Sequence, residues 1–231
     1  MKTITINIFC HFTYLPFTYN NYSARILYVQ AADIFHQRWK EGRQIKLSRE
    51  ETISSRNIYD GSILKLDLHE VILENQKIAR REIITHHGGV GVIPITASGE
   101  IVLVRQYRKP FEVETLEIPA GKKEKDEEPL TCAIRELREE TGITAGSINF
   151  LVDMYPSPGY TNEVVRIYKA EGLTYGDMST DEDEFVEVYR YTMKEAVELI
   201  KDGRIKDAKT IIAILMVANE RLDQSCGHMN K

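Results

Sequence analysis

Residues 121–143 read GKKEKDEEPLTCAIRELREETGI, and this stretch carries the strongest structural and chemical signal in the chain. Pro129 suits the first turn of a helix, and Gly142 suits the left-handed position just past the end of one. Between these two residues, apolar side chains recur at helical spacing at Leu130, Ala133, Ile134 and Leu137. The sequence therefore predicts a short helix with one face to bury.

The same stretch holds glutamates that fall on one side of the predicted helix. At about 100° per residue, Glu136, Glu139 and Glu140 lie within an arc of roughly 100°, away from the centre of the apolar stripe. We expect these three carboxylates to converge on the solvent side. Like charges at this spacing repel, and clustered oxygen ligands without Cys or His suit Mg²⁺ or Mn²⁺ better than zinc. The pattern indicates either a solvated acidic face or a site for a hard divalent cation.

The spacing of the glycines, glutamates and arginine in this stretch separates these two interpretations. The stretch matches the Nudix box at every specified position: Gly, five residues, Glu, seven residues, Arg-Glu, an aliphatic residue, any residue, Glu-Glu, any residue, Gly and an aliphatic residue. The chain therefore resembles the Nudix hydrolases, which cleave a nucleoside diphosphate linked to another group. The resemblance implies a metal-dependent enzyme with an α/β/α sandwich, in which the box forms a loop, a helix and a loop.

Composition limits the class of protein. With 231 residues, 42% of them hydrophobic, the chain can bury one sizeable core. A formal net charge of −5 and the lack of a basic run argue against a nucleic-acid partner. No apolar run is long enough to span a membrane, and the three cysteines are too widely separated to suggest a disulfide framework. Together with the lack of a signal-peptide pattern, these features predict a cytoplasmic protein without a membrane partner.

On either side of the box, the order of predicted elements indicates an α+β fold with mixed sheets. Residues 62–73 and 78–87 favour a β-hairpin, and residues 89–96 and 100–108 favour central strands that are buried on both faces. Further strands are expected at residues 115–118, 148–155, 164–170 and 185–192, and helices at residues 193–201 and 207–222, the last with Asp207 as its N-cap.

The predicted organisation has four parts. Residues 1–45 are an unassigned N-terminal extension, residues 46–88 an N-terminal β subdomain built on the hairpin, residues 89–222 the Nudix catalytic domain, and residues 223–231 a C-terminal tail. The hairpin resembles the intersubunit element of the ADP-ribose pyrophosphatase subfamily, so the resemblance implies a homodimer.

Three segments near the box also resemble that subfamily. They are VRQYRKPFEVETLEIPAGK at residues 104–122, YPSPGYTNE at residues 155–163 and STDEDEFVE at residues 179–187. The resemblance implies Mg²⁺-dependent hydrolysis of the diphosphate of ADP-ribose, a small nucleotide, to AMP and ribose 5-phosphate. Two alternatives stay open: a Nudix pyrophosphatase acting on other nucleoside diphosphate sugars or NADH, and a non-catalytic module that binds ADP-ribose.

The resemblance also assigns roles to individual residues. Glu136 and Glu140, followed by Glu139, are the expected metal ligands, together with the backbone carbonyl of Ala120. The catalytic candidates are Glu139 and the two glutamates of the acidic loop, Glu182 and Glu184, one of which is expected to act as general base. Arg135 is expected to orient the box glutamates, and Glu127 to brace the loop before the helix.

A second group of residues is assigned to the substrate. Arginine pairs well with phosphate oxygens, so Arg81 and Arg108 are candidates for the diphosphate or the terminal ribose, with exposed strand arginines as the alternative interpretation. The remaining candidates are Ser157 and Gly159 of the Ser-Pro-Gly loop, Glu163 just after it, and Tyr59 for stacking on adenine unless it is a core residue.

Overall fold

The computed structural model describes the backbone of residues 49–180 and 185–227, and the side chains of these segments as far as residue 221. The elements described here belong to one compact unit, Glu50–Lys231. The extension predicted for residues 1–45 lies outside the described residues, and so do Glu182 and Glu184. In the described part of the chain, no helix is long and apolar enough to cross a membrane.

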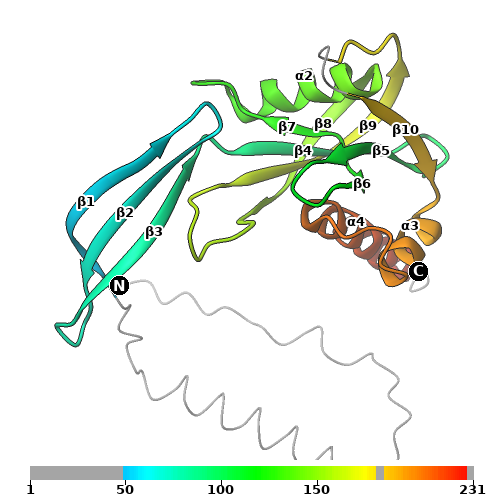
Figure 1. The fold of residues 1–231 in the computed structure, drawn as a ribbon. Helices are drawn as coiled ribbons and strands as arrows, with labels where there is room; N and C mark the ends of the chain where they lie inside the picture. The colour runs from blue at the N-terminus through cyan, green and yellow to red at the C-terminus, as the bar shows by residue number, and fades with distance from the viewer. Residues whose placement is uncertain (1–48, 181–184, 228–231) are drawn as a thin grey trace, which may run out of the picture. The chain divides into compact units, whose positions relative to one another are not determined.

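The described residues of this unit form ten strands and three helices (Figure 1). The strands are β1 (Glu51–Asp60), β2 (Leu64–Ile72), β3 (Ile78–His86), β4 (Gly89–Pro94), β5 (Ile101–Arg108), β6 (Val113–Glu117), β7 (Ala120–Lys122), β8 (Ile143–Met154), β9 (Val165–Tyr175) and β10 (Val186–Tyr191). The helices are α2 (Pro129–Thr141), α3 (Met193–Lys201) and α4 (Ala208–Gly227).

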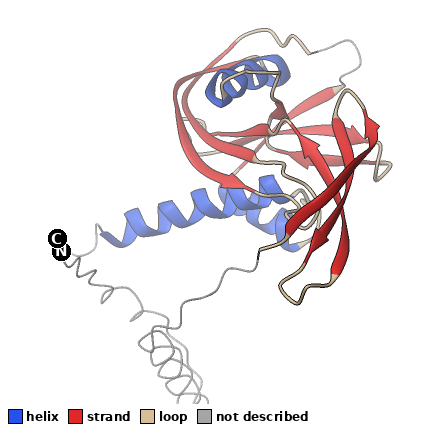
Figure 2. Ribbon diagram, turned by 90° about the vertical axis from the view of Figure 1, so that its left-hand side faces the viewer, coloured by secondary structure: helices blue, strands red, loops and turns tan. Residues whose placement is uncertain are grey.

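The strands form three sheets, with the orders β1-β2-β3, β10-β5-β6 and β7-β4-β9-β8. In the last of these, β4 pairs parallel with β9, whereas β7 and β8 pair antiparallel with their neighbours. Helix α2 lies on one side of this mixed sheet, and α3 and α4 lie on the other (Figures 1 and 2). The predicted α+β class with mixed sheets and an α/β/α sandwich is confirmed.

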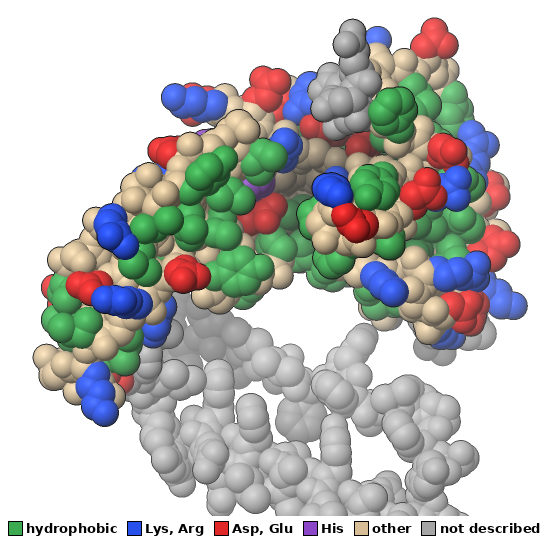
Figure 3. Space-filling model, in the orientation of Figure 1, with side chains coloured by type: hydrophobic (Ala, Val, Ile, Leu, Met, Phe, Trp, Pro, Cys, Tyr) green, Lys and Arg blue, Asp and Glu red, His purple; other side chains and the backbone are tan. Residues whose placement is uncertain are grey.

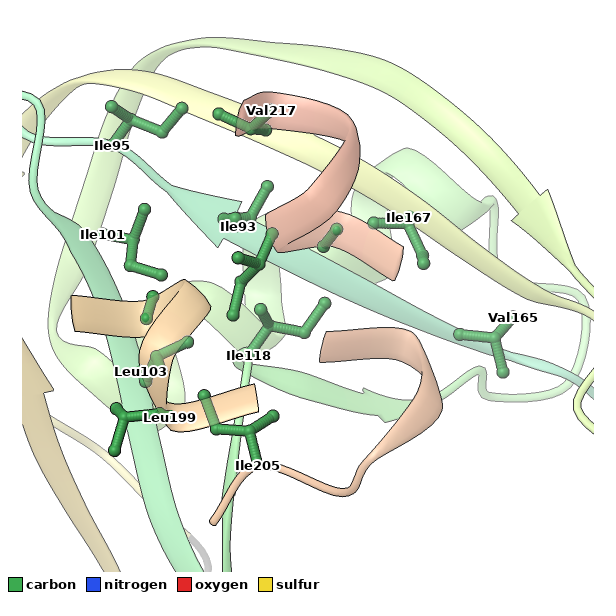
Figure 4. Close-up of a cluster of buried hydrophobic side chains, with 13 residues drawn as sticks. Ile93, Ile95, Ile101, Leu103, Ile118, Val165, Ile167, Leu199, Ile205 and Val217 are labelled. Atoms are coloured by element: carbon green, nitrogen blue, oxygen red, sulfur yellow. The ribbon is translucent and has the colours of Figure 1, made fainter. Parts of the chain in front are cut away.

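Two apolar clusters fill the space on either side of the mixed sheet, because side chains alternate between the faces of a strand. Ile93 and Ile167 point toward α3 and α4, where they pack with Leu199 and Val217 (Figure 4). Their neighbours Val92 and Tyr168 point the other way, toward Cys132, Ala133 and Leu137 of α2. Since all of β4 is buried, the prediction of a central strand covered on both faces is confirmed.

Helix α2 begins and ends where the sequence predicts. Pro129 occupies its first turn, and Gly142 has a φ of 67° and donates its backbone N–H to the carbonyl of Arg138. The predicted orientation of the helix is wrong, however. Leu130 and Ile134 are 44% and 48% exposed, whereas the carboxylate-bearing Glu136 is only 8% exposed. The helix is rotated so that its acidic side faces the protein, because backbone and side-chain donors there compensate the buried charge.

The N-terminal sheet differs from the predicted hairpin by one strand. The hairpin is present as β2 and β3, but β1 pairs with β2 along its whole length, from Glu51 opposite Ile72 to Asp60 opposite Lys65. All ten residues of β1 are exposed. A strand without a buried face lacks the apolar alternation that identifies strands in a sequence, so β1 was not predicted.

The C-terminal helices follow local signals. Helix α3 carries a capping box, in which Thr192 and Glu195 satisfy each other's backbone N–H groups. Asp207 precedes α4 and accepts a hydrogen bond from the backbone N–H of Thr210 at 3.0 Å, which confirms the predicted N-cap. The Thr210 hydroxyl donates to the Asp207 carboxylate at 2.5 Å and accepts the backbone N–H of Ile118 at 2.8 Å. These bonds tie the start of α4 to the residue that follows β6.

Candidate active site

A cleft of about 750 Å³ lies where the sheets, α2 and the start of α4 meet. Segments far apart in the sequence line it: the β1–β2 turn, the end of β3, β5, β7, α2, the loop after β8 and the N-terminus of α4. Charged side chains form two groups in and beside the lining. We call them the box wall, formed by Glu136, Glu139, Glu140 and Arg135, and the arginine wall, formed by the lining residues Arg108, Lys209 and Asp207 together with Glu117, the buried carboxylate that Arg108 and Lys209 bind.

The box wall depends on close contact between α2 and β7. An added Cβ at Gly121 would lie 1.9 Å from the carboxylate carbon of Glu136, so only glycine lets this side chain take its place. Glu140, 2% exposed, accepts the backbone N–H of Ala120 at 2.9 Å. The first glycine of the box is therefore a packing requirement of the site.

Arg135 is the central cation of the box wall. Its Nη1 donates to Glu136 at 2.8 Å and to Glu139 at 2.9 Å, and its Nε donates to Glu127 at 3.0 Å. The Glu127 carboxylate also receives the backbone N–H of Glu124 at 3.0 Å. These bonds, first that from Arg135, hold the pKa of Glu127 at about 2. The contacts agree with the expectation that Arg135 orients the box glutamates and that Glu127 braces the preceding loop.

The donors of the box wall fit a hard divalent cation. Within residues 49–180 and 185–221, no three acidic, His or Cys side chains converge into a ready-made metal group. Arg135 lies between Glu136 and Glu139 and so takes the position of a cation there. The carboxylates nonetheless line one cleft together with Ala120, and oxygen-only donors of this kind suit Mg²⁺ or Mn²⁺.

The arginine wall is built around Glu117, a carboxylate that is only 2% exposed. Arg108 binds it through Nε and Nη2, each at 2.7 Å, and Thr115 donates its hydroxyl at 2.6 Å. Lys209 contacts the same carboxylate, and its Nζ lies 3.0 Å from Asp207. Burial disfavours ionisation of Glu117, but Arg108 and Lys209 outweigh it and hold the pKa at about 2. The Glu117 carboxylate in turn raises the pKa of Arg108.

The loop after β8 reaches the cleft because it docks on the end of β3. The backbone N–H of Ile84 donates to the carbonyl of Tyr160 at 2.7 Å, and that of His86 donates to the Asn162 side chain at 2.9 Å. These bonds bring Glu163 into the cleft lining, where its carboxylate lies 3.5 Å from Nδ1 of His86. The Ser-Pro-Gly loop is therefore fixed to the N-terminal sheet.

The structure brings together only part of the predicted site. Arg108, Glu163, Ala120 and the three box glutamates line the cleft, whereas the remaining substrate candidates do not: Arg81, Tyr59, Ser157 and Gly159. Arg81 lies on β3 and binds Glu50 through two nitrogens at 2.6 and 2.9 Å. Tyr59 is 57% exposed on β1, so it is not a core residue within this chain.

Several residues of the site were not predicted from the sequence: Lys209, His86 and Gln106 line the cleft, and the buried Glu117 binds Arg108 and Lys209. Glu117 and Arg108 lie on the paired strands β6 and β5, opposite Val104 and Val113, and nothing local in the sequence marks that pairing. Lys209 lies two residues after the N-cap Asp207, so the N-cap signal places it in the first turn of a helix but does not indicate where that turn lies in the fold.

The family of the chain follows from this geometry and from comparison. A family model described as the NUDIX domain matches residues 85–213, a range that contains the box, the arginine of β5 and the start of α4. The chain therefore belongs to the Nudix family, and it is a hydrolase of that family.

The alignments with individual relatives cover about three quarters of this chain and more than nine tenths of each relative. The chain is 43% identical to an ADP-ribose pyrophosphatase of Bacillus subtilis over 74% of this chain and 93% of the relative. It is 44% identical to a methanol dehydrogenase activator of Bacillus methanolicus over 73% of this chain and 92% of the relative. A crystal structure of an ADP compounds hydrolase superposes with a TM-score of 0.71 over 78% of this chain and 97% of the other, at 22% identity, which supports the fold.

Proposed function

We propose that this Nudix hydrolase cleaves the diphosphate of ADP-ribose, giving AMP and ribose 5-phosphate. The observation that carries the proposal is the cleft itself, which is lined both by the carboxylates of the box wall and by Arg108 and Lys209. Such a cleft suits a ligand whose middle is an anionic diphosphate. The 43% identity with the ADP-ribose pyrophosphatase of Bacillus subtilis supports ADP-ribose as the substrate among the nucleoside diphosphate sugars.

The proposed cation site uses Glu136, Glu139, Glu140 and the carbonyl of Ala120. Bound there, Mg²⁺ or Mn²⁺ would neutralise the diphosphate and activate the attacking water. Arg135 keeps the carboxylates ordered before the cation arrives, because its guanidinium already holds two of them. In the arginine wall, Arg108 offers its remaining N–H groups to phosphate oxygens, since Glu117 occupies only Nε and Nη2.

The general base is proposed to be Glu182 or Glu184. Both lie outside the described residues, but the chain just before them is attached to the box helix. The backbone N–H of Ser179 donates to the carbonyl of Glu139 at 3.1 Å, and that of Gly176 donates to Gly142 at 2.8 Å. We expect Glu182→Gln or Glu184→Gln to lower kcat far more than it raises KM. If neither variant does so in steady-state kinetics, the base lies elsewhere.

The proposed function is tested by a product assay. Purified protein is incubated with ADP-ribose, NADH and several nucleoside diphosphate sugars, with Mg²⁺, with Mn²⁺ and with excess chelator. We expect AMP release to be fastest from ADP-ribose and to stop when the metal is removed. Faster cleavage of another compound would show that this compound, and not ADP-ribose, is the preferred substrate. Tight ADP-ribose binding without AMP release in either metal would favour the non-catalytic binding module.

A second candidate function is the activation of a methanol dehydrogenase. The identity of 44% with the Bacillus methanolicus protein of that name favours it. The measurement is the rate of a methanol dehydrogenase with and without the purified protein, using Glu140→Gln as a control for hydrolysis. An unchanged dehydrogenase rate would exclude this candidate.

We also propose that the protein is a homodimer that acts in the cytoplasm. Hydrophobic side chains gather on the face of the N-terminal sheet shown in Figure 3. Large apolar residues of this sheet and its turn are about half exposed, namely Ile53, Ile58, Tyr59, Ile63 and Ile78. Burying such a patch against a second copy is favourable. Sedimentation of a monomer of about 26.6 kDa would contradict the dimer.

A further inference from the structure

Gln106 carries a buried polar atom that lacks a partner. In the described part of the chain, two buried side-chain nitrogens or oxygens make no hydrogen bond: Nε2 of Gln106 and Nε of Arg105. The Arg105 atom lies 3.5 Å from a carboxylate oxygen of Glu114 and so keeps an ion-pair partner. The amide nitrogen of Gln106 has no acceptor among the described residues.

The position of Gln106 connects this orphaned donor to the cleft. Gln106 lies on β5, the central strand of its sheet, with Val186 opposite on β10 and Thr115 opposite on β6. Residues two apart on a strand point to the same face, so Gln106 and Arg108 share a face of β5. Both residues line the cleft.

A buried amide donor without an acceptor lowers the stability of the free protein, because the group has lost its water and gained nothing in return. The cost disappears if a ligand brings an acceptor to the same place. Beside Asp207, the side chains of the arginine wall that line the cleft are the cations Arg108 and Lys209. A ligand that complements them offers acceptor oxygens and negative charge, and a phosphoryl group offers both.

We propose that Gln106 binds the substrate by donating its Nε2–H to a non-bridging phosphoryl oxygen of the nucleoside diphosphate, beside the guanidinium of Arg108. The inference rests on the proposed function, which supplies the diphosphate. It assigns Gln106 a part in substrate binding, and it explains why a donor on a central strand is left without a partner in the free protein.

The test is Gln106→Met, which keeps the length of the side chain and removes both polar atoms. We expect KM for ADP-ribose to rise roughly 10- to 100-fold while kcat changes by no more than about threefold, because a binding contact is lost. The melting temperature of the ligand-free protein should stay the same or rise, because the orphaned donor is gone. An unchanged KM overturns the proposal. A melting temperature lowered by several degrees also overturns it, because the donor then has an acceptor within the protein.

A second variant and a control keep the result interpretable. Gln106→Glu has the same shape but offers only acceptors and a negative charge, so KM should rise further than in Gln106→Met; a KM near that of the wild type overturns the proposal even if the methionine variant fails to fold. Tyr107→Leu is the control, because Tyr107 lies on the other face of β5 and does not line the cleft. Its KM should equal that of the wild type.

The two proposals fail separately. If the wild-type protein releases no AMP from ADP-ribose, the proposed substrate is wrong, and the KM ratio for Gln106→Met is then measured on the nucleoside diphosphate that the product assay identifies. If ADP-ribose is cleaved normally but the ratio is close to one, the assignment of Gln106 alone is wrong.

Discussion

The two charged walls of the cleft bury carboxylates in different ways. In the box wall, Arg135 is shared among Glu127, Glu136 and Glu139. In the arginine wall, Arg108, Lys209 and the hydroxyl of Thr115 all bind the Glu117 carboxylate. Two cations and one hydroxyl donor therefore stabilise a single carboxylate.

This difference shows what each wall can do. The box wall has an excess of negative charge and therefore favours the arrival of a cation. The arginine wall is balanced internally, with Asp207 beside Lys209, and its remaining N–H groups favour an anionic ligand. Because acceptors and donors line the same cleft, a cation and a diphosphate can be held together in it. The predictions below test whether the walls have these separate roles.

The largest effect is expected from the box wall. Glu140→Gln removes a charge from the proposed cation site, while its amide oxygen can still accept the N–H of Ala120. We expect kcat with Mg²⁺ to fall by at least about 10²- to 10³-fold with an unchanged circular dichroism spectrum. Glu128→Gln, an exposed substitution at the start of α2 where the side chain makes no cap bond, should be fully active. Near-normal turnover by Glu140→Gln would remove Glu140 from the cation site.

A smaller loss is expected when the box wall is displaced without losing charge. In Gly121→Ala, the new Cβ meets the Glu136 carboxylate at about 2 Å, so this side chain must move. A shift of about 1 Å in a catalytic group costs roughly 10²-fold in rate. Gly176→Ala is the matched control, because its nearest neighbour is the carbonyl oxygen of Gly142 at 3.6 Å. Equal kcat values for both variants would contradict the packing role of Gly121.

For the arginine wall, the main effect is expected on stability. Glu117→Gln leaves Arg108 and Lys209 without their shared counter-charge, and breaking a buried ion pair in this way costs about 3 kcal/mol. We expect the unfolding free energy in urea to fall by that amount and KM to rise, because Arg108 is no longer fixed. Asp153→Asn removes the partner of Arg166 in an exposed pair with bonds of 2.7 and 2.9 Å. It should cost less than about 1 kcal/mol; similar losses in the two variants would show that burial does not matter here.

The smallest expected effect is a pH dependence of the stability that Glu117→Gln loses. The pKa of Glu117 is lowered from its ordinary value of 4.5 to about 2. A lowered folded-state pKa means that the stabilisation is present above pH 4.5 and is lost as the pH falls toward 2. The difference in unfolding free energy between the wild type and Glu117→Gln should therefore be constant from pH 7 to about pH 5 and shrink below that range. A difference that stays constant down to pH 3 would show that folding does not lower the pKa of Glu117.

Local signals predicted the elements of the fold well. Pro129 and Gly142 delimit α2, and Asp207 caps α4, because each of these effects depends on backbone groups within one turn. The strand β1 was missed because all ten of its residues are exposed, so its sequence lacks a buried face. Its pairing is decided by β2, which a local pattern cannot show.

The box illustrates the same limit within the site. Its spacing identified the family, the chemistry and the proposed ligands Glu136, Glu139 and Glu140. The direction in which these side chains point was predicted wrongly, because a prediction from helical periodicity assigns charged residues to the solvent-exposed side of a helix. Glu136 is buried because Gly121 leaves space for its carboxylate. Glu140 is buried with the backbone N–H of Ala120 as a hydrogen-bond donor to its carboxylate.

The sequence by itself determined the family, the helix that carries the carboxylates and most element boundaries, because these depend on residues close together in the chain. Only the tertiary structure decided which charges share a cleft. Arg108 and Lys209 are separated by about a hundred residues and meet at Glu117 because β5 pairs with β6 and the start of α4 is tied to Ile118. The burial of a charge, and the donors that compensate it, are properties of such long-range contacts.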